Sequence, residues 1–109
     1  MALTDWQRID DLAAEIGADA VVEVVVMFLE ETDEVMARLA TGTPTTDDYH
    51  FLKGSALNLG LTDLVTLCQL GEQETKAGMV NTATQDAVVA LYPASKDALI
   101  DGIAARFGG

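Results

Sequence analysis

The stretch from Tyr49 to Gly60, YHFLKGSALNLG, repeats its apolar side chains at the spacing of an amphipathic helix. At about 100° per residue, one side of such a helix carries Tyr49, Leu52, Ser55, Ala56 and Leu59. The opposite side carries His50, Lys53, Gly54 and Leu57. The first set predicts a face packed in a helical core, and the second predicts a face turned to solvent or to a partner. We therefore expect His50, the only histidine of the chain, to be exposed.

The rest of the chain is divided into further helical segments by glycine, proline and threonine. Counting the stretch above, we expect helices over residues 5–16, 19–40, 44–59, 63–76 and 82–107. The beginning of the second segment is rich in valine, which is typical of strands, but its acidic continuation and its length favour a helix. Because strand-like alternation is nearly absent, the sequence predicts an all-α protein.

Local signals predict how two of these helices begin and end. Thr4 is expected to cap the first helix, with Gln7 reaching back in a capping box. Thr43 is expected to cap the third helix, with Pro44 in the first helical position. Gly60 is expected to end the third helix.

The connections between the expected helices are short, which favours antiparallel neighbours in a bundle. We expect one domain over residues 1–109, built as an antiparallel four-helix bundle with a short additional helix at the N-terminus. Pro93 lies inside the last helix, so we expect a kink or a short break around Leu91 and Tyr92.

The charge balance excludes several classes of partner. The chain has 109 residues, and its 18 Asp and Glu face only six Lys and Arg, which gives a formal net charge of −12. Binding to nucleic acid or to an anionic membrane surface depends on clusters of basic residues, and the basic residues here are scattered. We therefore expect neither partner. Since half of the residues are hydrophobic, the acidity does not indicate disorder.

Cysteine usage and the N-terminal sequence predict the compartment. The single cysteine, Cys68, cannot form a disulfide within one chain, which favours a reducing compartment. The first residues lack the basic and apolar regions of a secretory signal, and the most apolar run is too short to span a bilayer. We expect a cytoplasmic protein.

The residues around His50 indicate a site that accepts an anion. Lys53 at i+3 and Gly54 at i+4 lie beside the ring on a helix. A glycine inside a helix costs about 1 kcal/mol relative to alanine, which is easier to explain if another molecule approaches there. Neutral imidazole is a nucleophile near pH 7, and Lys53 can stabilise the charge of a phosphoryl group carried on it. Asp47, at i−3, is a weaker candidate for orienting the ring.

The stretch from His50 to Gly60, HFLKGSALNLG, resembles the signature of histidine-containing phosphotransfer (Hpt) domains, H-x-x-K-G-S with a later glycine. Phe28 and Leu29 precede it at about the usual distance, and the segment that carries Leu64, Leu67, Cys68 and Glu72 is similar to the following helix of the family. The resemblance covers nearly the whole chain. Gly71 departs from it, because the family often has a larger apolar residue there.

The resemblance implies an antiparallel four-helix bundle with His50 exposed on one helix. It implies that His50 is the phosphoacceptor, through Nε2, and carries a phosphoryl group from a receiver-domain aspartate to another receiver. On this interpretation Lys53 stabilises the phosphoryl charge, and Gly54 leaves room for the active-site loops of the receiver. Partners would be response-regulator receiver domains and a hybrid or other sensor histidine kinase.

The resemblance implies a carrier and not an autonomous kinase, since no nucleotide-binding motif is visible. No cofactor and no metal are expected in this chain, and Mg²⁺ would belong to the receiver. The apolar residues beside the ring, Leu57 first and Phe51 second, are the candidates for docking. We expect a monomer.

Three alternatives remain open from the sequence. The first is a helical interaction module whose histidine is incidental, which leaves the grouping of His50, Lys53 and Gly54 unexplained. The second is an enzyme that uses His50 as a general base or a metal ligand, although no ligand spacing supports it. The third keeps the fold and makes the chain the phosphoacceptor domain of a separate chemotaxis-type kinase.

Overall fold

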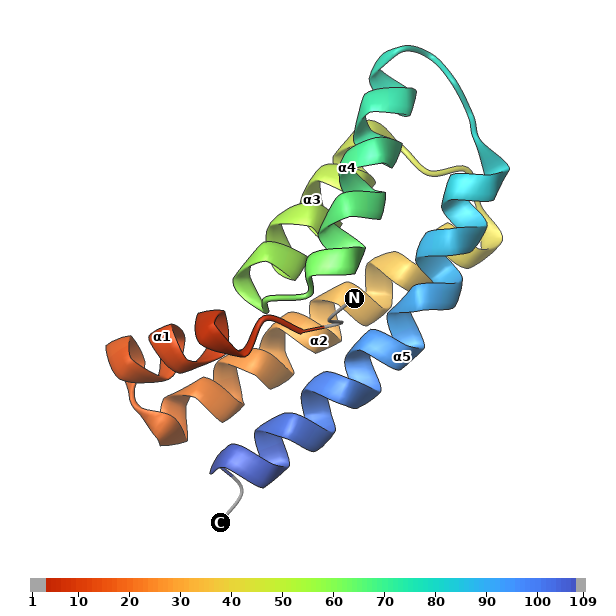
Figure 1. Cartoon of the computed structure of the whole chain (residues 1–109). Helices are drawn as coiled ribbons and strands as arrows, with labels where there is room; N and C mark the ends of the chain where they lie inside the picture. The colour runs from red at the N-terminus through yellow and green to blue at the C-terminus, as the bar shows by residue number, and fades with distance from the viewer. Residues whose placement is uncertain (1–3, 108–109) are drawn as a thin grey trace.

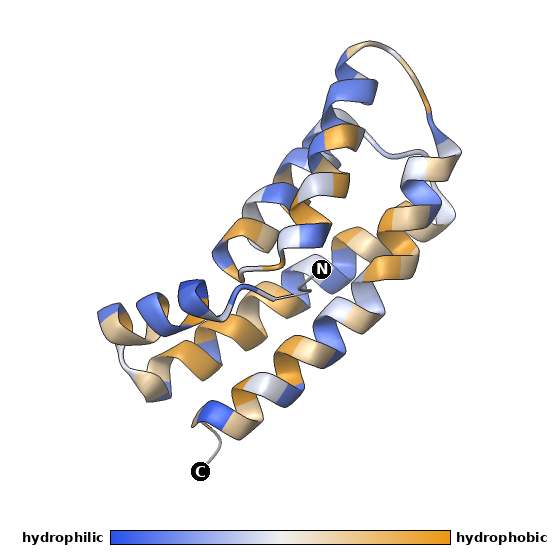
Figure 2. Cartoon of the chain, in the orientation of Figure 1, coloured by the Kyte–Doolittle hydropathy of each residue, from blue (hydrophilic) through white to orange (hydrophobic). Residues whose placement is uncertain are grey.

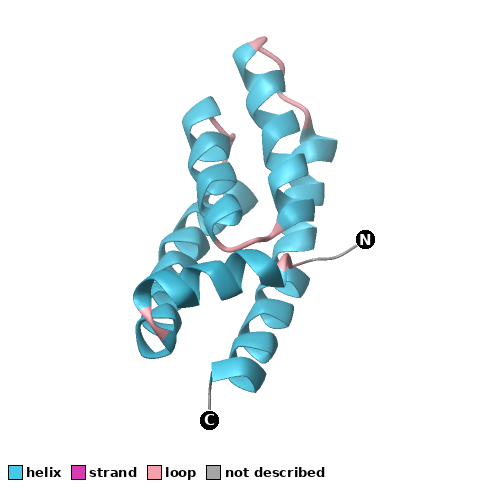
Figure 3. Ribbon diagram, turned by 60° about the vertical axis from the view of Figure 1, so that its left-hand side comes forward, coloured by secondary structure: helices cyan, strands magenta, loops and turns pink. Residues whose placement is uncertain are grey.

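Five helices and their short connections make up residues 4–107, the part of the chain that the computed structural model describes. The helices are α1 (Trp6–Ile16), α2 (Ala18–Thr41), α3 (Thr46–Asn58), α4 (Thr62–Lys76) and α5 (Thr82–Phe107) (Figure 1). No residue of this part lies in a strand (Figure 3). The predicted all-α class and the order of the helices are therefore confirmed, and the predicted bounds differ from the observed ones by two residues or fewer.

Each helix contacts the next one in the sequence, and α2 also contacts α5. Helix α3 contacts α4 and α2, α5 contacts α2 and α4, and α1 contacts α2. Figure 1 shows α3 and α4 side by side as a pair, with α1 beside the first half of α2. The molecule is elongated, with extents of 45 × 23 × 21 Å. None of the five described helices is both long and apolar enough to cross a membrane.

The core draws on all five helices because each has an apolar stripe at helical spacing. Fully buried members from α1 to α5 include Ile9, Leu39, Leu52, Leu64 and Leu99. Figure 2 shows hydrophobic residues recurring along α2 and α5, the two longest helices. The predicted buried face of α3 is confirmed, since Tyr49, Leu52, Ser55, Ala56 and Leu59 are all buried.

The predicted cap of α1 is wrong by one residue. Asp5, and not Thr4, is the N-cap, because its side chain accepts a hydrogen bond of 3.1 Å from the backbone N–H of Gln7. Asp5 also donates its own N–H to the carbonyl of Gly60 at 2.5 Å. This bond ties the chain to the turn after α3, and the neighbouring Thr4 is buried. The helix therefore begins one residue later than the threonine signal predicts.

The predicted cap of α3 is wrong by two residues. The N-cap is Thr45, whose hydroxyl accepts from the N–H of Asp48, while the Asp48 carboxylate accepts from the N–H of Thr45, both at 3.1 Å. This capping box satisfies two backbone donors at once. Thr43 has no acidic partner three residues later, so Pro44 stays outside the helix. Gly60 follows the helix with φ of +70°, as expected for a residue that ends it.

Pro93 does not interrupt α5. The helix continues from Thr82 to Phe107, so the break expected around Leu91 and Tyr92 does not occur. Two side chains that flank the proline attach this part of α5 to Asp33 of α2. The Tyr92 hydroxyl donates to Asp33 at 2.6 Å, and the Lys96 ammonium lies 2.8 Å from the same carboxylate. These contacts hold the helix against α2 on both sides of Pro93.

Helices α3 and α4 approach each other closely at Gly71. A Cβ atom on this residue would lie 2.5 Å from the Cε1 and Cζ atoms of Tyr49, so only glycine leaves room for the ring. The glycine at this position is therefore required by the close packing of α4 on α3 at Tyr49. Because Glu72 is the next residue, this close approach brings its carboxylate to the surface of α3 that carries His50.

Candidate functional site

His50 lies in the middle of α3 with its ring turned away from the core. Its side chain is 69% exposed, whereas Tyr49, the residue before it, is buried. The exposure predicted from the helical wheel is therefore what the structure has. An exposed ring on a helix that is packed on its other side is accessible to a second protein.

The Nδ1 atom of His50 is paired with a carboxylate from the neighbouring helix. It lies 3.3 Å from Oε1 of Glu72, a side chain that is only 7% exposed. An ionised carboxylate can only accept hydrogen bonds, so we assign the ring proton to Nδ1 and let it donate to Glu72. In that tautomer Nε2 carries the lone pair. The pairing therefore leaves Nε2 as the ring nitrogen without a proton.

Two lysines bind the same carboxylate. The Nζ atom of Lys53 lies 2.6 Å from Oε2 of Glu72, and the Nζ atom of Lys76 lies 3.1 Å from Oε1. These four residues, His50, Lys53, Glu72 and Lys76, are called the His50 cluster below. The ammonium groups of Lys53 first and then of Lys76 lower the pKa of Glu72 from 4.5 to about 2, against the opposing effect of burial. Glu72 is therefore ionised at neutral pH.

The surface beside the ring is open at Gly54. A Cβ atom built on this glycine would meet nothing within 4 Å. Packing within the chain therefore gives no reason for a glycine here, in contrast to Gly71, where a Cβ would collide with Tyr49. The absence of a side chain at Gly54 therefore leaves the surface of α3 beside His50 open.

The two apolar residues named as docking candidates are both exposed. Leu57 is 55% exposed and Phe51 is 38% exposed. Phe51 also lines a cleft between α2 and α3, whose other lining residues are Glu31, Glu34, Val35, Arg38, Asp47 and Asp48. Asp47 belongs to this cleft, and among residues 4–107 the acidic partner of the His50 ring is Glu72.

Glu72 and Lys76 were not predicted as members of the site. Their relation to each other has a sequence signal, because Glu72 and Lys76 are four residues apart and so lie on one side of α4. No local sequence pattern predicts that they lie close to His50, because this proximity depends on how α4 packs against α3. The buried stripe of α4, with Leu64, Cys68 and Gly71, indicates only that Glu72 borders the core.

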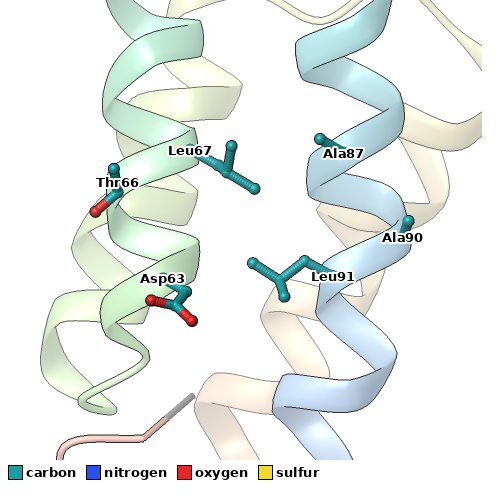
Figure 4. A pocket seen from close by; sticks show the side chains of 6 residues that line it. All are labelled: Asp63, Thr66, Leu67, Ala87, Ala90 and Leu91. Atoms are coloured by element: carbon teal, nitrogen blue, oxygen red, sulfur yellow. The ribbon is translucent and has the colours of Figure 1, made fainter. Parts of the chain in front are cut away.

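A second hollow lies between α4 and α5. It has a volume of about 550 Å³ and is lined by Asp63, Thr66, Leu67, Ala87, Ala90 and Leu91. Figure 4 shows Leu67 and Leu91 pointing toward each other across it. Its lining is mostly apolar and includes no member of the His50 cluster. Nowhere in residues 4–107 do three or more His, Cys, Asp or Glu side chains gather as they would around a metal ion.

Comparison with known proteins agrees with this geometry. The family model of the Hpt domain matches residues 23–102, a range that contains the whole His50 cluster. Neither a curated protein nor a solved structure matches the chain. The family match covers well over half of the 109 residues and confirms the resemblance read from the sequence between His50 and Gly60. The chain therefore belongs to the Hpt domain family.

Proposed function

We propose that this protein accepts a phosphoryl group on Nε2 of His50 from the aspartate of a receiver domain and passes it to the aspartate of another receiver. Hpt domains act in histidine phosphotransfer in phosphorelays, where they interact with receiver domains and kinases. The observation that supports the proposal most strongly is the pairing of an exposed His50 ring with the buried carboxylate of Glu72 through Nδ1.

The chemistry of the transfer follows from this pairing. The lone pair of Nε2 attacks the phosphorus of the aspartyl phosphate, so that an N–P bond forms, the P–O bond breaks and the aspartate leaves as a carboxylate. The ring keeps its proton on Nδ1 and becomes a cation. Glu72 accepts the hydrogen bond of that cation, which is stronger than the bond of the neutral ring. Transfer to the second receiver reverses these steps.

Lys53 is proposed to stabilise the charge of the phosphoryl group. Its ammonium group is held within the His50 cluster by Glu72 at 2.6 Å, and its side chain is 25% exposed. A cation fixed in place before the reaction needs no reorganisation when charge arrives. Lys53 therefore serves as a prearranged counter-charge for the transferred group.

The surface around His50 is proposed to dock the receiver. Gly54 gives the active-site loops of the receiver access to the ring, and the exposed apolar side chains of Leu57 and Phe51 pack against them. The exposure of both side chains and the open space at Gly54 support this assignment. The protein contributes no cofactor, and the Mg²⁺ needed for the reaction is bound by the receiver.

The architecture proposed for this function is an antiparallel bundle of α2 to α5 with α1 as an additional helix. The contacts of α2 with α5, of α3 with α4 and of α4 with α5 support it. We propose that the protein acts as a cytoplasmic monomer, because a single exposed ring presents the whole reacting group without a second copy.

Transfer from a phosphorylated receiver tests the proposal. The receiver, labelled on its aspartate, is mixed with the wild-type protein, His50→Gln and Lys53→Ala. The wild type gains acid-labile label, His50→Gln gains none, and Lys53→Ala keeps its fold but transfers more slowly or holds the phosphoryl group for a shorter time. Adding an unlabelled second receiver then removes the label from the wild type.

Two results would reject the proposal. One is a wild type that no phosphorylated receiver labels, and the other is label that persists in His50→Gln. Label that arrives only from a chemotaxis-type kinase and never from a receiver would instead favour a phosphoacceptor domain of such a kinase.

A further inference from the structure

Lys76 is placed next to His50 by the same oxygen atom that holds the ring. Oε1 of Glu72 lies 3.3 Å from Nδ1 of His50 and 3.1 Å from Nζ of Lys76. The side chain of Lys76 is 64% exposed, whereas that of Glu72 is 7% exposed. The chain has only three lysines, and Glu72 holds two of them beside its one histidine.

We propose that Lys76 is a second phosphoryl-binding residue, which Glu72 holds beside His50 before transfer and releases to the phosphoryl group afterwards. This inference rests on the proposed function and deepens it by adding a residue from α4 to the acceptor site. Lys76 then contacts the transferred group directly, in addition to Lys53.

The exchange of partners follows from the charges. Before transfer, the His50 cluster holds two ammonium groups, one carboxylate and a neutral ring. Phosphorylation makes the ring a cation and adds a group with a charge of about −1.5 to −2. The cationic Nδ1–H binds Oε1 of Glu72 more strongly than the neutral ring does, so Lys76 loses part of its attraction to that oxygen. The phosphoryl oxygens on the same ring offer Lys76 a more negative partner than the carboxylate.

The two lysines differ in how easily they can move. Lys53 lies 2.6 Å from the other carboxylate oxygen, Oε2, and its side chain is 25% exposed, so it is held more firmly. Lys76 reaches the buried carboxylate of Glu72 from one helical turn away with a side chain that is 64% exposed, so its ammonium group stays open to solvent. Its flexible four-carbon side chain can therefore swing from Glu72 to the phosphoryl group without disturbing α4.

A measurement without a receiver tests this inference separately from the proposed function. His50 is phosphorylated with the small-molecule donor phosphoramidate, and the second ionisation of the phosphoryl group is followed by ³¹P NMR against pH. A nearby cation favours the dianion and lowers this pKa. The proteins compared are the wild type, Lys76→Ala, Lys76→Arg and Lys53→Ala. Lys96→Ala is the matched control, because Lys96 pairs with Asp33 of α2 and is no member of the His50 cluster.

Lys76→Ala is expected to raise the protonation constant of the phosphoryl group about threefold, or half a pKa unit, which is the effect of one exposed ion pair. Lys76→Arg keeps the wild-type value, and so does Lys96→Ala. A Lys76→Ala protein with the wild-type value would overturn the inference, as would an equal shift in Lys96→Ala. A folded wild type that phosphoramidate does not phosphorylate on His50 would overturn it too. If the shift is found but no receiver transfers to His50, the proposed function fails while the contact of Lys76 stands.

Discussion

The carboxylate of Glu72 is 7% exposed, and the imidazole that it holds is 69% exposed. This difference lets a buried side chain orient an exposed ring. Without the pairing, an exposed ring would sample both tautomers and several rotamers. With it, Nδ1 is engaged by Glu72, which leaves Nε2 as the nitrogen that we propose to react.

The pH dependence of stability reports on this carboxylate. Its pKa is about 2 in the folded protein and 4.5 ordinarily, because Lys53 and then Lys76 bind the ionised form. A group whose pKa is lower in the folded state stabilises that state above its unfolded pKa and ceases to do so as pH falls through its folded pKa. The stabilisation by Glu72 is therefore complete above about pH 4.5 and disappears toward pH 2.

Urea unfolding of the wild type and Glu72→Gln between pH 3 and pH 7 measures this effect. The difference in the free energy of unfolding between the two proteins is expected to be constant above about pH 4.5 and to shrink below it. A difference that is the same at pH 3 and at pH 7 would show that the lysines do not hold Glu72 as an anion.

Gly54 separates stability from activity. Because a Cβ at this position meets nothing within 4 Å, Gly54→Ala is expected to stabilise α3 by about 0.5–1 kcal/mol. Gly54→Gln places a longer side chain beside the ring and is expected to slow transfer at least about tenfold while the protein stays folded. Urea unfolding and transfer rates check both. A Gly54→Gln protein that transfers at the wild-type rate would remove the role of Gly54 in access.

The site residues on α3 could be predicted from the sequence, whereas the site residues on α4 could not. His50, Lys53 and Gly54 lie within five consecutive positions of one helix, so the helical repeat alone places them together. Glu72 and Lys76 join them through a contact between two helices. A single sequence carries no measure of the rotation and translation of one helix against another. The sequence therefore offers Asp47, on the same helix as His50, as a candidate for orienting the ring, whereas the residue that pairs with the ring is Glu72.

Among the helices, the contact between α3 and α4 decides the geometry of the site. Gly71 lets α4 approach the ring of Tyr49, and Glu72 follows directly. Gly71→Ala would place a Cβ 2.5 Å from two ring atoms, and such overpacking is expected to cost about 1–3 kcal/mol. It should also move Glu72 relative to His50 and slow transfer.

The matched control for Gly71→Ala is Gly54→Ala, the same substitution on the partner helix at a position with free space. Chemical denaturation should give opposite signs for the two changes in the free energy of unfolding. Equal effects of both substitutions would mean that α3 and α4 do not meet closely at Gly71.

The helices were predictable in number and approximate extent, but their ends less so. Apolar periodicity extends over many residues, so one deviating position does not change the interpretation. A cap depends on one or two hydrogen bonds, and several nearby threonines and aspartates can make them. The chain uses Asp5 and Thr45 as caps, because each has a hydrogen-bond partner two or three residues later. Pro93 lies within an unbroken α5, which Asp33, on another helix, holds through Tyr92 and Lys96.

At the scale of the whole molecule, the His50 cluster brings two lysines together in a chain whose net charge is −12. In the described part of the chain, Arg38, Lys96 and Arg106 each pair with a single carboxylate, that of Asp48, Asp33 and Asp10 respectively. Glu72 is the carboxylate that two cations share. The net charge alone excluded classes of partner. The helical repeat placed Lys53 beside His50, and the fold adds Lys76 to the same cluster.

The position of the phosphoryl group tests the central claim most directly. The protein, with ¹⁵N-labelled histidine, is incubated with a phosphorylated receiver domain and examined by ³¹P and ¹⁵N NMR, with His50→Gln as the control. We predict one phosphoryl group per molecule, coupled to Nε2 of His50, and none in the control. A phosphoryl group on Nδ1 or on another side chain, or no phosphoryl group at all, would contradict the account.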